Sequence, residues 1–487
     1  MGRPIRFLMD GEVRDLADAD PTLTVLNWLR YDVRRTGTKE GCAEGDCGAC
    51  TVVLAELDGG KVRFRAMNAC ILFVPMLDGK ALFTVESPAR DGALHPVQQA
   101  MVDRHGSQCG FCTPGFVMSL YAHQRSGAPV DTANLKDALA GNLCRCTGYG
   151  PILAAGQAMG ADPDAADLPA LAKALAAIQS DEALDFEHKG RRFSAPRTLA
   201  DFAAEAQARP DARIVAGATD VGLWVTKQHR VLPDILSINE VAELRQIEDL
   251  GDAIRIGAGV RYVDAHGPLT ALHPEFGGLL RRLGGLQVRN AGSLCANIAN
   301  GSPIGDTPPA LIAAGATLVL RRGEETRTLP LEDYFQAYGR QDRRPGEFVE
   351  AVVVPRIPAG QVFRVFKLSK RFDQDISAVC AAFSLAIEGG KVRAARIAFG
   401  GMAATPKRAP ATEAALVGGP WSEAAVRAAA GSLAEDFQPI SDLRASADYR
   451  LAAARNLLVK TFLESDQPAA PRLADLEPLV AEASPHG

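Results

Sequence analysis

Residues 108–115 read Q-C-G-F-C-T-P-G, and residues 142–148 read N-L-C-R-C-T-G. These two stretches carry two cysteine pairs, Cys109 with Cys112 and Cys144 with Cys146. Four thiolates that meet at one point bind either a tetrahedral zinc ion or an iron–sulfur cluster. The C-x-C pair favours iron–sulfur, because zinc ligand pairs usually leave about two to four residues between the cysteines. On this spacing alone, zinc and a disulfide framework stay open.

A second cysteine set lies upstream, in the stretch G-C-A-E-G-D-C-G-A-C at residues 41–50. It has a C-x4-C-x2-C run followed by a distant fourth cysteine, which is the spacing of a plant-type 2Fe–2S cluster. Its members are Cys42, Cys47, Cys50 and Cys70. We expect Gly41, Gly45 and Gly48 to adopt positive φ and to turn backbone N–H groups toward the sulfides. One such cluster makes a second one the natural interpretation of residues 109–146.

The neighbours of these cysteines carry a family resemblance. The stretches H-G-S-Q-C-G-F-C-T-P-G-F-V-M-S (105–119) and G-N-L-C-R-C-T-G-Y (141–149) are similar to the iron–sulfur part of the molybdenum hydroxylases. Within that family they resemble the xanthine dehydrogenases in particular, and the likeness extends to about residue 460. The resemblance implies two 2Fe–2S clusters, the first in a β-grasp ferredoxin fold and the second among helices.

Composition excludes several other classes of protein. The 487 residues suggest about three domains. A net charge of −5 without a basic run gives no footprint for nucleic acid or an anionic membrane. No stretch predicts a signal peptide or a membrane span. Ten cysteines without a signal peptide indicate metal ligands in a reducing compartment, so we expect a cytoplasmic protein. Cys295 and Cys380, outside both sets, are expected to be small buried hydrophobes.

Periodicity predicts an α+β multidomain chain. Hairpins are expected at residues 5–16 and 51–67, with one helix near 23–29 between them. Helices follow at 94–102, from Thr113-Pro114 as cap and first turn, and from Leu135 to Cys144. The expected domains are 1–85 (ferredoxin-like), 86–160 (helical 2Fe–2S), 161–185 (linker), 186–358 (FAD-binding), 359–470 (C-terminal α+β) and 471–487 (tail).

Two polar segments point to a flavin. A strand at 213–216 is expected to enter G-A-T-D-V-G at 217–222, where backbone N–H groups can face a pyrophosphate. Alone, this loop is equally explained as a structural turn. The second segment, 289–306, is rich in Gly, Ser and Asn, which suits a loop around a polar ligand. The pair resembles the two flavin-binding segments of the xanthine dehydrogenase FAD domain, which is not a Rossmann fold.

The resemblance transfers roles to individual residues. Predicted FAD contacts are Ile214, Val215, Ala216, Gly217, Ala218, Thr219, Asp220, Val221, Leu283, Ser293, Asn297, Asp306, Val349 and Lys367. An exposed strand lysine is the alternative for Lys367. Tyr338 falls near the NAD face, and Asp373 and Gln374 fall in a loop that controls access of NAD. Two departures stand out: Cys295-Ala296 replaces a usual Gly-Gly, and Ala43 replaces a common glycine.

The resemblance also implies a route for electrons. It runs from molybdenum in a partner, through the Cys109–Cys146 cluster and the Cys42–Cys70 cluster, to FAD and then NAD. Gln108 matches a position that contacts the partner's molybdopterin, although a plain surface role is the alternative. No residue of the hydroxylation site is expected here, so the chain is expected to be the small subunit of a split xanthine dehydrogenase in an (αβ)2 heterotetramer. Other substrates (an aldehyde, an N-heterocycle or CO) and a zinc-stabilised, non-enzymatic scaffold are the alternatives.

Overall fold

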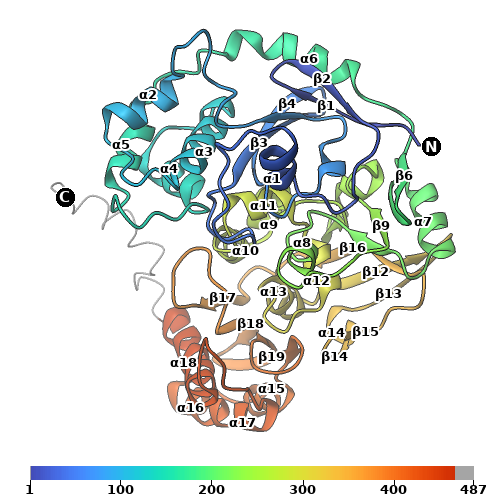
Figure 1. Ribbon diagram of the computed structural model, residues 1–487. Helices are drawn as coiled ribbons and strands as arrows, with labels where there is room; N and C mark the ends of the chain where they lie inside the picture. The colour runs from blue at the N-terminus through green and yellow to red at the C-terminus, as the bar shows by residue number, and fades with distance from the viewer. Residues whose placement is uncertain (1, 467–487) are drawn as a thin grey trace.

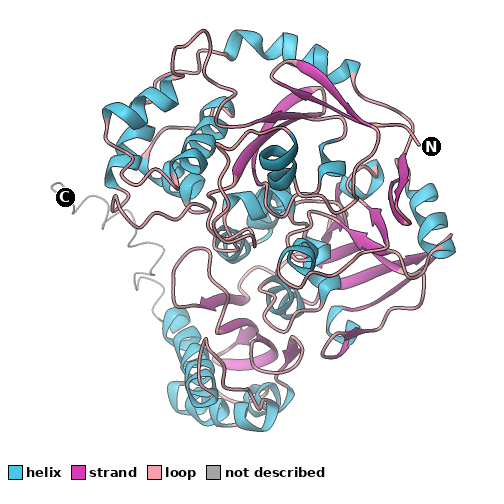
Figure 2. Cartoon of the chain, viewed as in Figure 1, coloured by secondary structure: helices cyan, strands magenta, loops and turns pink. Residues whose placement is uncertain are grey.

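Four modules joined by a linker pack against one another (Figure 1), and all but the second contain both helices and strands (Figure 2). The computed structural model describes residues 2–466. The tail expected at 471–487 therefore lies outside the described residues. The mixed content of helix and strand confirms the α+β multidomain class.

The first module is a five-stranded sheet in the order β2-β1-β5-β3-β4. β1 pairs antiparallel with β2 and parallel with β5, as in a β-grasp fold. Asp10 and Gly11 both adopt positive φ, as a type I′ hairpin turn requires. A short helix, α1 (Val25–Asn27), is capped by Thr24 and crosses the sheet. The strands are β1 (Ile5–Met9), β2 (Glu12–Leu16), β3 (Thr51–Asp58), β4 (Lys61–Asn68) and β5 (Ala81–Phe83).

The second module is helical, and two details of the sequence prediction are wrong. Its helices are α2 (Pro96–Asp103), α3 (Thr113–Arg125), α4 (Thr132–Leu139) and α5 (Gly150–Ala158). Cys112, rather than Thr113, is the N-cap of α3. The helix expected to reach Cys144 ends at Leu139, because the backbone beyond it turns away to bond the first module through Leu143 N–H. The sequence pattern also missed α5.

The linker is itself packed against the first module. Within residues 161–185, α6 (Leu168–Ala177) lies along the sheet. Leu175 and Ile178 are buried against Leu8 and Ala55 of that sheet. In Figure 1 this segment arches over the first module on its way to the third. The connection is therefore a strap rather than a free tether.

The third module combines two sheets. One has the order β6-β7-β9-β8 and the other β10-β11-β16-β12-β13. The first sheet holds β6 (Leu184–His188), β7 (Arg191–Ala195), β9 (Asp234–Ser237) and β8 (Arg213–Val215). The second holds β10 (Ile247–Asp249), β11 (Ala253–Gly257), β16 (Phe348–Pro355), β12 (Thr317–Arg322) and β13 (Glu325–Pro330). The second sheet lies in one hydrophobic core, which Leu236 of β9 also joins. Most buried residues of the first sheet, among them Phe193, Val215 and Ile235, instead share a core with the first module.

Short helices of the third module carry the polar segments. They are α7 (Leu199–Ala208), α8 (Val221–Thr226), α9 (Tyr262–Leu272), α10 (Pro274–Arg281), α11 (Leu286–Ala291), α12 (Leu294–Asn300) and α13 (Thr307–Ala314). A hairpin of β14 (Phe335–Ala337) and β15 (Arg340–Gln341) follows α14 (Leu331–Tyr334). Figure 1 shows α8, α11, α12 and α13 gathered near the centre of the molecule.

The fourth module is a sheet covered by helices. The sheet runs β17 (Val362–Leu368), β18 (Val379–Glu388), β19 (Lys391–Gly400) and β20 (Lys407–Arg408). Its helices are α15 (Pro410–Leu416), α16 (Glu423–Gly431), α17 (Leu433–Asp436) and α18 (Ala447–Asp466). Across residues 2–466, no helix combines the length and apolar character that crossing a membrane needs.

Candidate cofactor sites

The first cysteine set converges between α1 and β3, with the fourth member just after β4. The Cys42 thiol interacts with those of Cys47 and Cys70, and Cys50 interacts with Cys70. The backbone N–H groups of residues 44, 46 and 47 donate to Cys42 Sγ at 3.3–3.4 Å. The thiol contacts, together with these N–H donors, lower the pKa of Cys42. Cys50 and Cys70 are buried. The loop therefore offers four converging sulfurs and donors to their charge.

The backbone of this loop follows the expectation except at one glycine. Gly45 and Gly48 adopt positive φ, and so does Ala43, at 54°. Ala43 thus keeps the left-handed conformation of the glycine that it replaces. Gly41 does not adopt positive φ. A Cβ at this position would lie 2.7 Å from Cys47 Sγ, so glycine is needed here because a larger residue would not fit.

The second set converges at the N-terminus of α3, where Cys112 is the N-cap. Cys109 interacts with Cys146, and Cys112 with Cys144. Burial raises the pKa of Cys112 to about 12, helped by Cys144. Burial also acts to raise the pKa of Cys144, but hydrogen bonds from the Thr147 hydroxyl and nearby N–H groups outweigh it and lower the pKa to about 7. Cys109 and Cys146 are exposed, so this site opens to the surface.

One backbone hydrogen bond joins the two cysteine sets directly. Leu143 N–H donates to the carbonyl of Cys47 at 3.0 Å. Leu143 precedes Cys144 in the chain. A single hydrogen bond between loops of different modules thus connects Cys47 to the residue that precedes Cys144.

The two polar segments of the third module meet and form a cradle. The amides of residues 217–220 donate to no acceptor within the described part of the chain. Gly217 packs on the backbone of Ala291 and Gly292, where a Cβ would overlap, and Ala218 has φ 55°. Successive free N–H groups in a tight loop suit a phosphate or pyrophosphate.

Asp306 and Lys367 form a buried ion pair beside this cradle. Lys367 Nζ lies 2.6 Å from Asp306 Oδ2, and Ser377 Oγ donates to Asp306 Oδ1 at 2.5 Å. The lysine is therefore not an exposed strand residue. Asn297 accepts a bond from the Thr307 hydroxyl at 2.6 Å.

The other predicted contacts take ordinary places in the fold. Ser293 caps α12, where its side chain accepts from Ala296 N–H. Leu283 and Val349 lie in the hydrophobic core, and Cys295 and Cys380 are buried, as expected of small hydrophobes. Ala296 occupies α12.

The cradle touches the first cysteine loop. Thr226 at the end of α8 donates through its hydroxyl to the Ala43 carbonyl at 2.7 Å. Gly222 packs on Ile71, next to Cys70, where a Cβ would lie 2.8 Å from Ile71 Cβ. The first cysteine set therefore lies between the second set and the cradle.

Three family models match the chain. They are described as "[2Fe-2S] binding domain" (residues 84–157), "FAD binding domain in molybdopterin dehydrogenase" (186–357) and "CO dehydrogenase flavoprotein C-terminal domain" (364–465). The chain is the iron–sulfur and flavin portion of a molybdenum hydroxylase. The cofactors are accordingly iron–sulfur clusters of the 2Fe–2S type and FAD, and zinc at the second set is not supported.

Relatives and solved structures agree with this family. Xanthine dehydrogenase of Drosophila subobscura is 33% identical over 94% of this chain, and that of Emericella nidulans is 31% identical over 89%. The chain spans only 39% and 36% of their lengths. Carbon monoxide dehydrogenase from Hydrogenophaga pseudoflava matches 55% of this chain and 93% of its own at 29% identity, with a TM-score of 0.52. Quinoline 2-oxidoreductase from Pseudomonas putida 86 matches 57% and 97% at 25% identity, also at 0.52.

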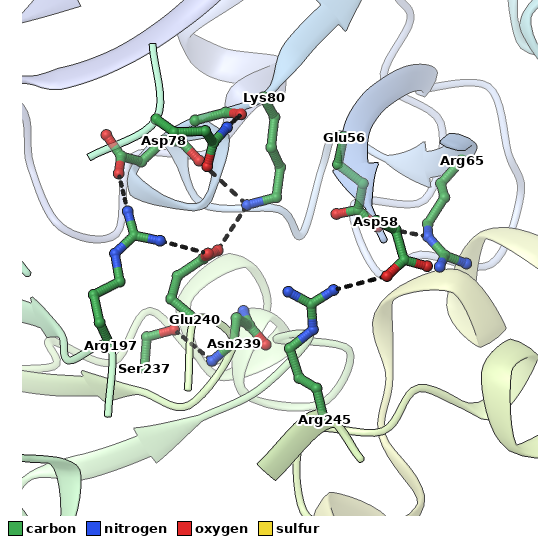
Figure 3. A network of polar contacts seen from close by, with 12 residues as sticks. Glu56, Asp58, Arg65, Asp78, Lys80, Arg197, Ser237, Asn239, Glu240 and Arg245 are labelled. Carbon is green, nitrogen blue, oxygen red and sulfur yellow. Dashed lines mark hydrogen bonds and ion pairs between the residues drawn. The ribbon is translucent and has the colours of Figure 1, made fainter. Parts of the chain in front are cut away.

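In this hydroxylase portion, an ionic seam fixes the first module on the flavin module (Figure 3). Lys80 and Asp78 of the first module contact Glu240 (2.8 Å) and Arg197 (3.5 Å) of the flavin module. Arg197 also contacts Glu240 at 3.0 Å, and Arg245 lies 3.9 Å from Asp58. Each contact between the modules therefore matches opposite charges.

Glu56 is a second buried carboxylate of this interface. It is held between Arg65 of its own module and Arg261 of the flavin module. Burial acts to raise its pKa, but the two guanidinium groups outweigh that effect and hold the pKa well below its usual range. The charge is therefore kept, and it ties β3 to the start of α9.

Three further predicted residues lie at the edges. Gln108 is exposed beside Cys109. Tyr338, 76% exposed, occupies the turn between β14 and β15, and Gln341 of this hairpin contacts the Asn300 carbonyl near the flavin segment. Gln374 points away from solvent and donates to the Asp46 carbonyl at 2.8 Å, so its loop rests on the first cysteine loop.

Sequence reasoning missed the residues that join the modules. Thr226, Glu56 and Arg261 carried no local signal, since each looks like an ordinary helix or strand residue. Gln287, in α11, is buried to 1% exposure at the meeting point of three modules. A glutamine within the short apolar run Leu-Gln-Val is the faint hint that was available.

Proposed function

We propose that this chain passes electrons from a molybdenum centre in a partner to NAD, as the iron–sulfur and FAD component of a xanthine dehydrogenase. The partner binds molybdopterin and oxidises hypoxanthine and xanthine to urate, and the two chains assemble as (αβ)2. Gln108 contacts the pterin, and the flavin end, near Tyr338, receives NAD.

The spatial order of the sites carries this proposal. The Cys109–Cys146 set opens to the surface, the Cys42–Cys70 set lies inside, and the flavin cradle is on its far side. Backbone and hydroxyl hydrogen bonds at 3.0 and 2.7 Å connect the three in that order, through Leu143 to Cys47 and Thr226 to Ala43. Exposed Phe111 and Tyr149 beside the outer set offer apolar surface to a partner.

The groups differ in what they supply when bound: the clusters carry single electrons, and FAD exchanges electron pairs with a nicotinamide as hydride. The chain itself supplies cysteine ligands, backbone donors at residues 44, 46 and 47, and the buried Asp306–Lys367 pair. These groups hold and tune the cofactors.

A second substrate class is favoured by the structural matches. Carbon monoxide dehydrogenase and quinoline 2-oxidoreductase align with similar scores. Substrate choice belongs to the molybdenum partner. We place xanthine first because the xanthine dehydrogenases cited above align along 89–94% of this chain. A substrate panel of xanthine, aldehydes, N-heterocycles and CO on the assembled enzyme decides between them.

The test uses the chain alone and with its partner. Alone, it should oxidise NADH with an artificial acceptor, leave xanthine untouched, and show two distinct 2Fe–2S signals by electron paramagnetic resonance after reduction. Two signals are expected because cluster environment and solvent access differ between the sets. A single signal with half the expected iron, or purine turnover without a partner, contradicts the proposal.

A further inference from the structure

Gln287 lies where the two iron–sulfur modules and the flavin module meet. Its side-chain amide Nε2 lies 3.1 Å from Thr51 Oγ1, 3.2 Å from Ser119 Oγ and 3.1 Å from Asn142 Oδ1. Thr51 belongs to the first module, and Ser119 and Asn142 belong to the second. A single side chain from the flavin module therefore bonds to both iron–sulfur modules.

The partners of Gln287 reach the cysteine loops. Asn142 Nδ2 donates to the Gly48 carbonyl at 3.1 Å, and the Thr51 hydroxyl donates to the same carbonyl at 2.6 Å. Gly48 follows Cys47, and Asn142 precedes Leu143, whose N–H bonds to Cys47. The amide network thus surrounds the hydrogen bond that joins the two cysteine sets.

Backbones approach so closely here that side chains have no room. A Cβ on Gly285 would lie 2.5 Å from Gly141 Cα, and a Cβ on Gly48 or Gly115 would overlap the facing backbone. Gln287 Oε1 is buried against Gly141 and has no hydrogen-bond partner. An unsatisfied buried acceptor is unfavourable, so the amide is not explained by stability alone.

We infer that Gln287 is a positioning residue for electron transfer between the two clusters. It holds the Cys47 loop and the Leu143–Cys144 loop at a fixed separation from its place on the flavin module. An electron that crosses here oxidises one cluster and reduces the other, and no co-reactant is required. This inference rests on the proposed function. It means that a residue of the flavin module, Gln287, fixes the relative position of the two iron–sulfur modules.

The test compares Gln287→Leu with Gln99→Leu, an exposed glutamine of α2. In the holoenzyme, Gln287→Leu should retain iron and FAD, but the magnetic interaction between the two reduced clusters should change. Rapid-freeze paramagnetic resonance after NADH addition should show the outer cluster reduced at least tenfold more slowly, with the inner cluster unaffected. Gln99→Leu should match the wild type in both measurements.

A milder pair of variants covers the case in which Gln287→Leu does not fold. Ser119→Ala removes one acceptor of the amide, and Ser126→Ala, at the end of the same helix, removes an exposed hydroxyl. Ser119→Ala should change the magnetic interaction in the same sense, and Ser126→Ala should not. Unchanged interaction and rate in fully loaded Gln287→Leu, or in Ser119→Ala if only that variant folds, overturns the inference. A wild-type chain without two clusters would instead refute the proposed function.

Discussion

The two cysteine sets each bring four thiols together, but they differ in their exposure to solvent. In the first, Cys50 and Cys70 are buried and Cys42 and Cys47 are partly buried; Thr226 of the flavin module and Gln374 of the fourth module contact the loop. In the second, Cys109 and Cys146 are exposed beside Gln108. The contrast shows that position in the molecule, rather than the ligand set, separates an internal relay from a site that faces a partner. Each prediction below breaks or sharpens this contrast.

Removing one ligand from each set should have the largest effect. Cys112→Ala should lose half of the iron and keep FAD, because the flavin segments 217–222 and 289–306 belong to another module. Cys50→Ala should lose the inner cluster and also weaken FAD binding, since the loop supports Thr226 and Gln374. Iron and flavin analysis of the purified variants measures both.

In the flavin module, Asp306→Ala should lose FAD and retain both clusters.

In the assembled enzyme that carries Cys112→Ala, xanthine should no longer reduce FAD, whereas NADH should still reduce it. Full iron in Cys112→Ala, or normal reduction of FAD by xanthine when that cluster is absent, would refute the separation of roles.

The buried interface of the inner module should be costly to break. Glu56→Gln leaves Arg65 and Arg261 without their shared carboxylate, and loss of one partner from a buried pair costs about 3–5 kcal/mol. Asp15→Asn, in the exposed pair with Arg6, is the matched control and should change little. Denaturant unfolding compares the free energies; equal effects of the two variants would count against the interface.

Exposure should also set how fast each cluster loses iron. A chelator reaches the outer cluster directly, but it reaches the inner one only after local opening of the covering modules. We expect the outer signal to disappear roughly tenfold faster or more in a time course of paramagnetic resonance. The Cys112→Ala variant, with only the inner cluster, gives the slow phase alone. Equal rates of iron loss from the two clusters would show that burial does not protect the inner cluster from the chelator.

The smallest expected effect is a pH dependence confined to the outer module. His95 caps α2, faces Asp164 and is 4% exposed; burial lowers its pKa from the ordinary value of 6.5, despite nearby Asp162 and Asp164. Below pH 6.5 the unfolded chain therefore binds a proton that the folded chain does not, so the free energy of unfolding decreases as pH falls below that value.

His95→Asn keeps a capping acceptor but does not titrate, so its unfolding should lose this dependence. Glu56 behaves differently: its pKa is lowered, so the stability that it provides is lost only as pH falls below its ordinary value of 4.5. Thermal unfolding between pH 5 and 7 measures the difference. An unchanged slope in His95→Asn would refute the assignment to His95.

The sequence predicted the features that depend on local spacing. Both cysteine sets and the hairpin over Asp10-Gly11 follow from residue type and interval alone. The end of α4 could not be predicted in this way, because Leu143 leaves the helix to bond to Cys47 in another module. Gln287 and Thr51 are 236 positions apart, and no periodicity links them.

The flavin residues were located by family resemblance rather than by local pattern. The cradle at 217–220 could equally be a turn until its packing on Ala291 and its free amides are seen. Lys367 looked like an exposed strand residue until its pairing with Asp306 was visible. Site residues whose roles depend on contacts between modules can be identified only once the three-dimensional structure is known.

The order of modules in space differs from their order along the chain, and this bears on biosynthesis. The module that lies in the middle, residues 5–83, leaves the ribosome before the other three modules. N-terminal domains generally fold first during synthesis. The central piece can therefore be in place before the helical module, α6, the flavin module and finally the fourth module are synthesised. Each later module docks on a surface that already exists, and the flavin module completes the junction with Gln287 before the fourth module is added.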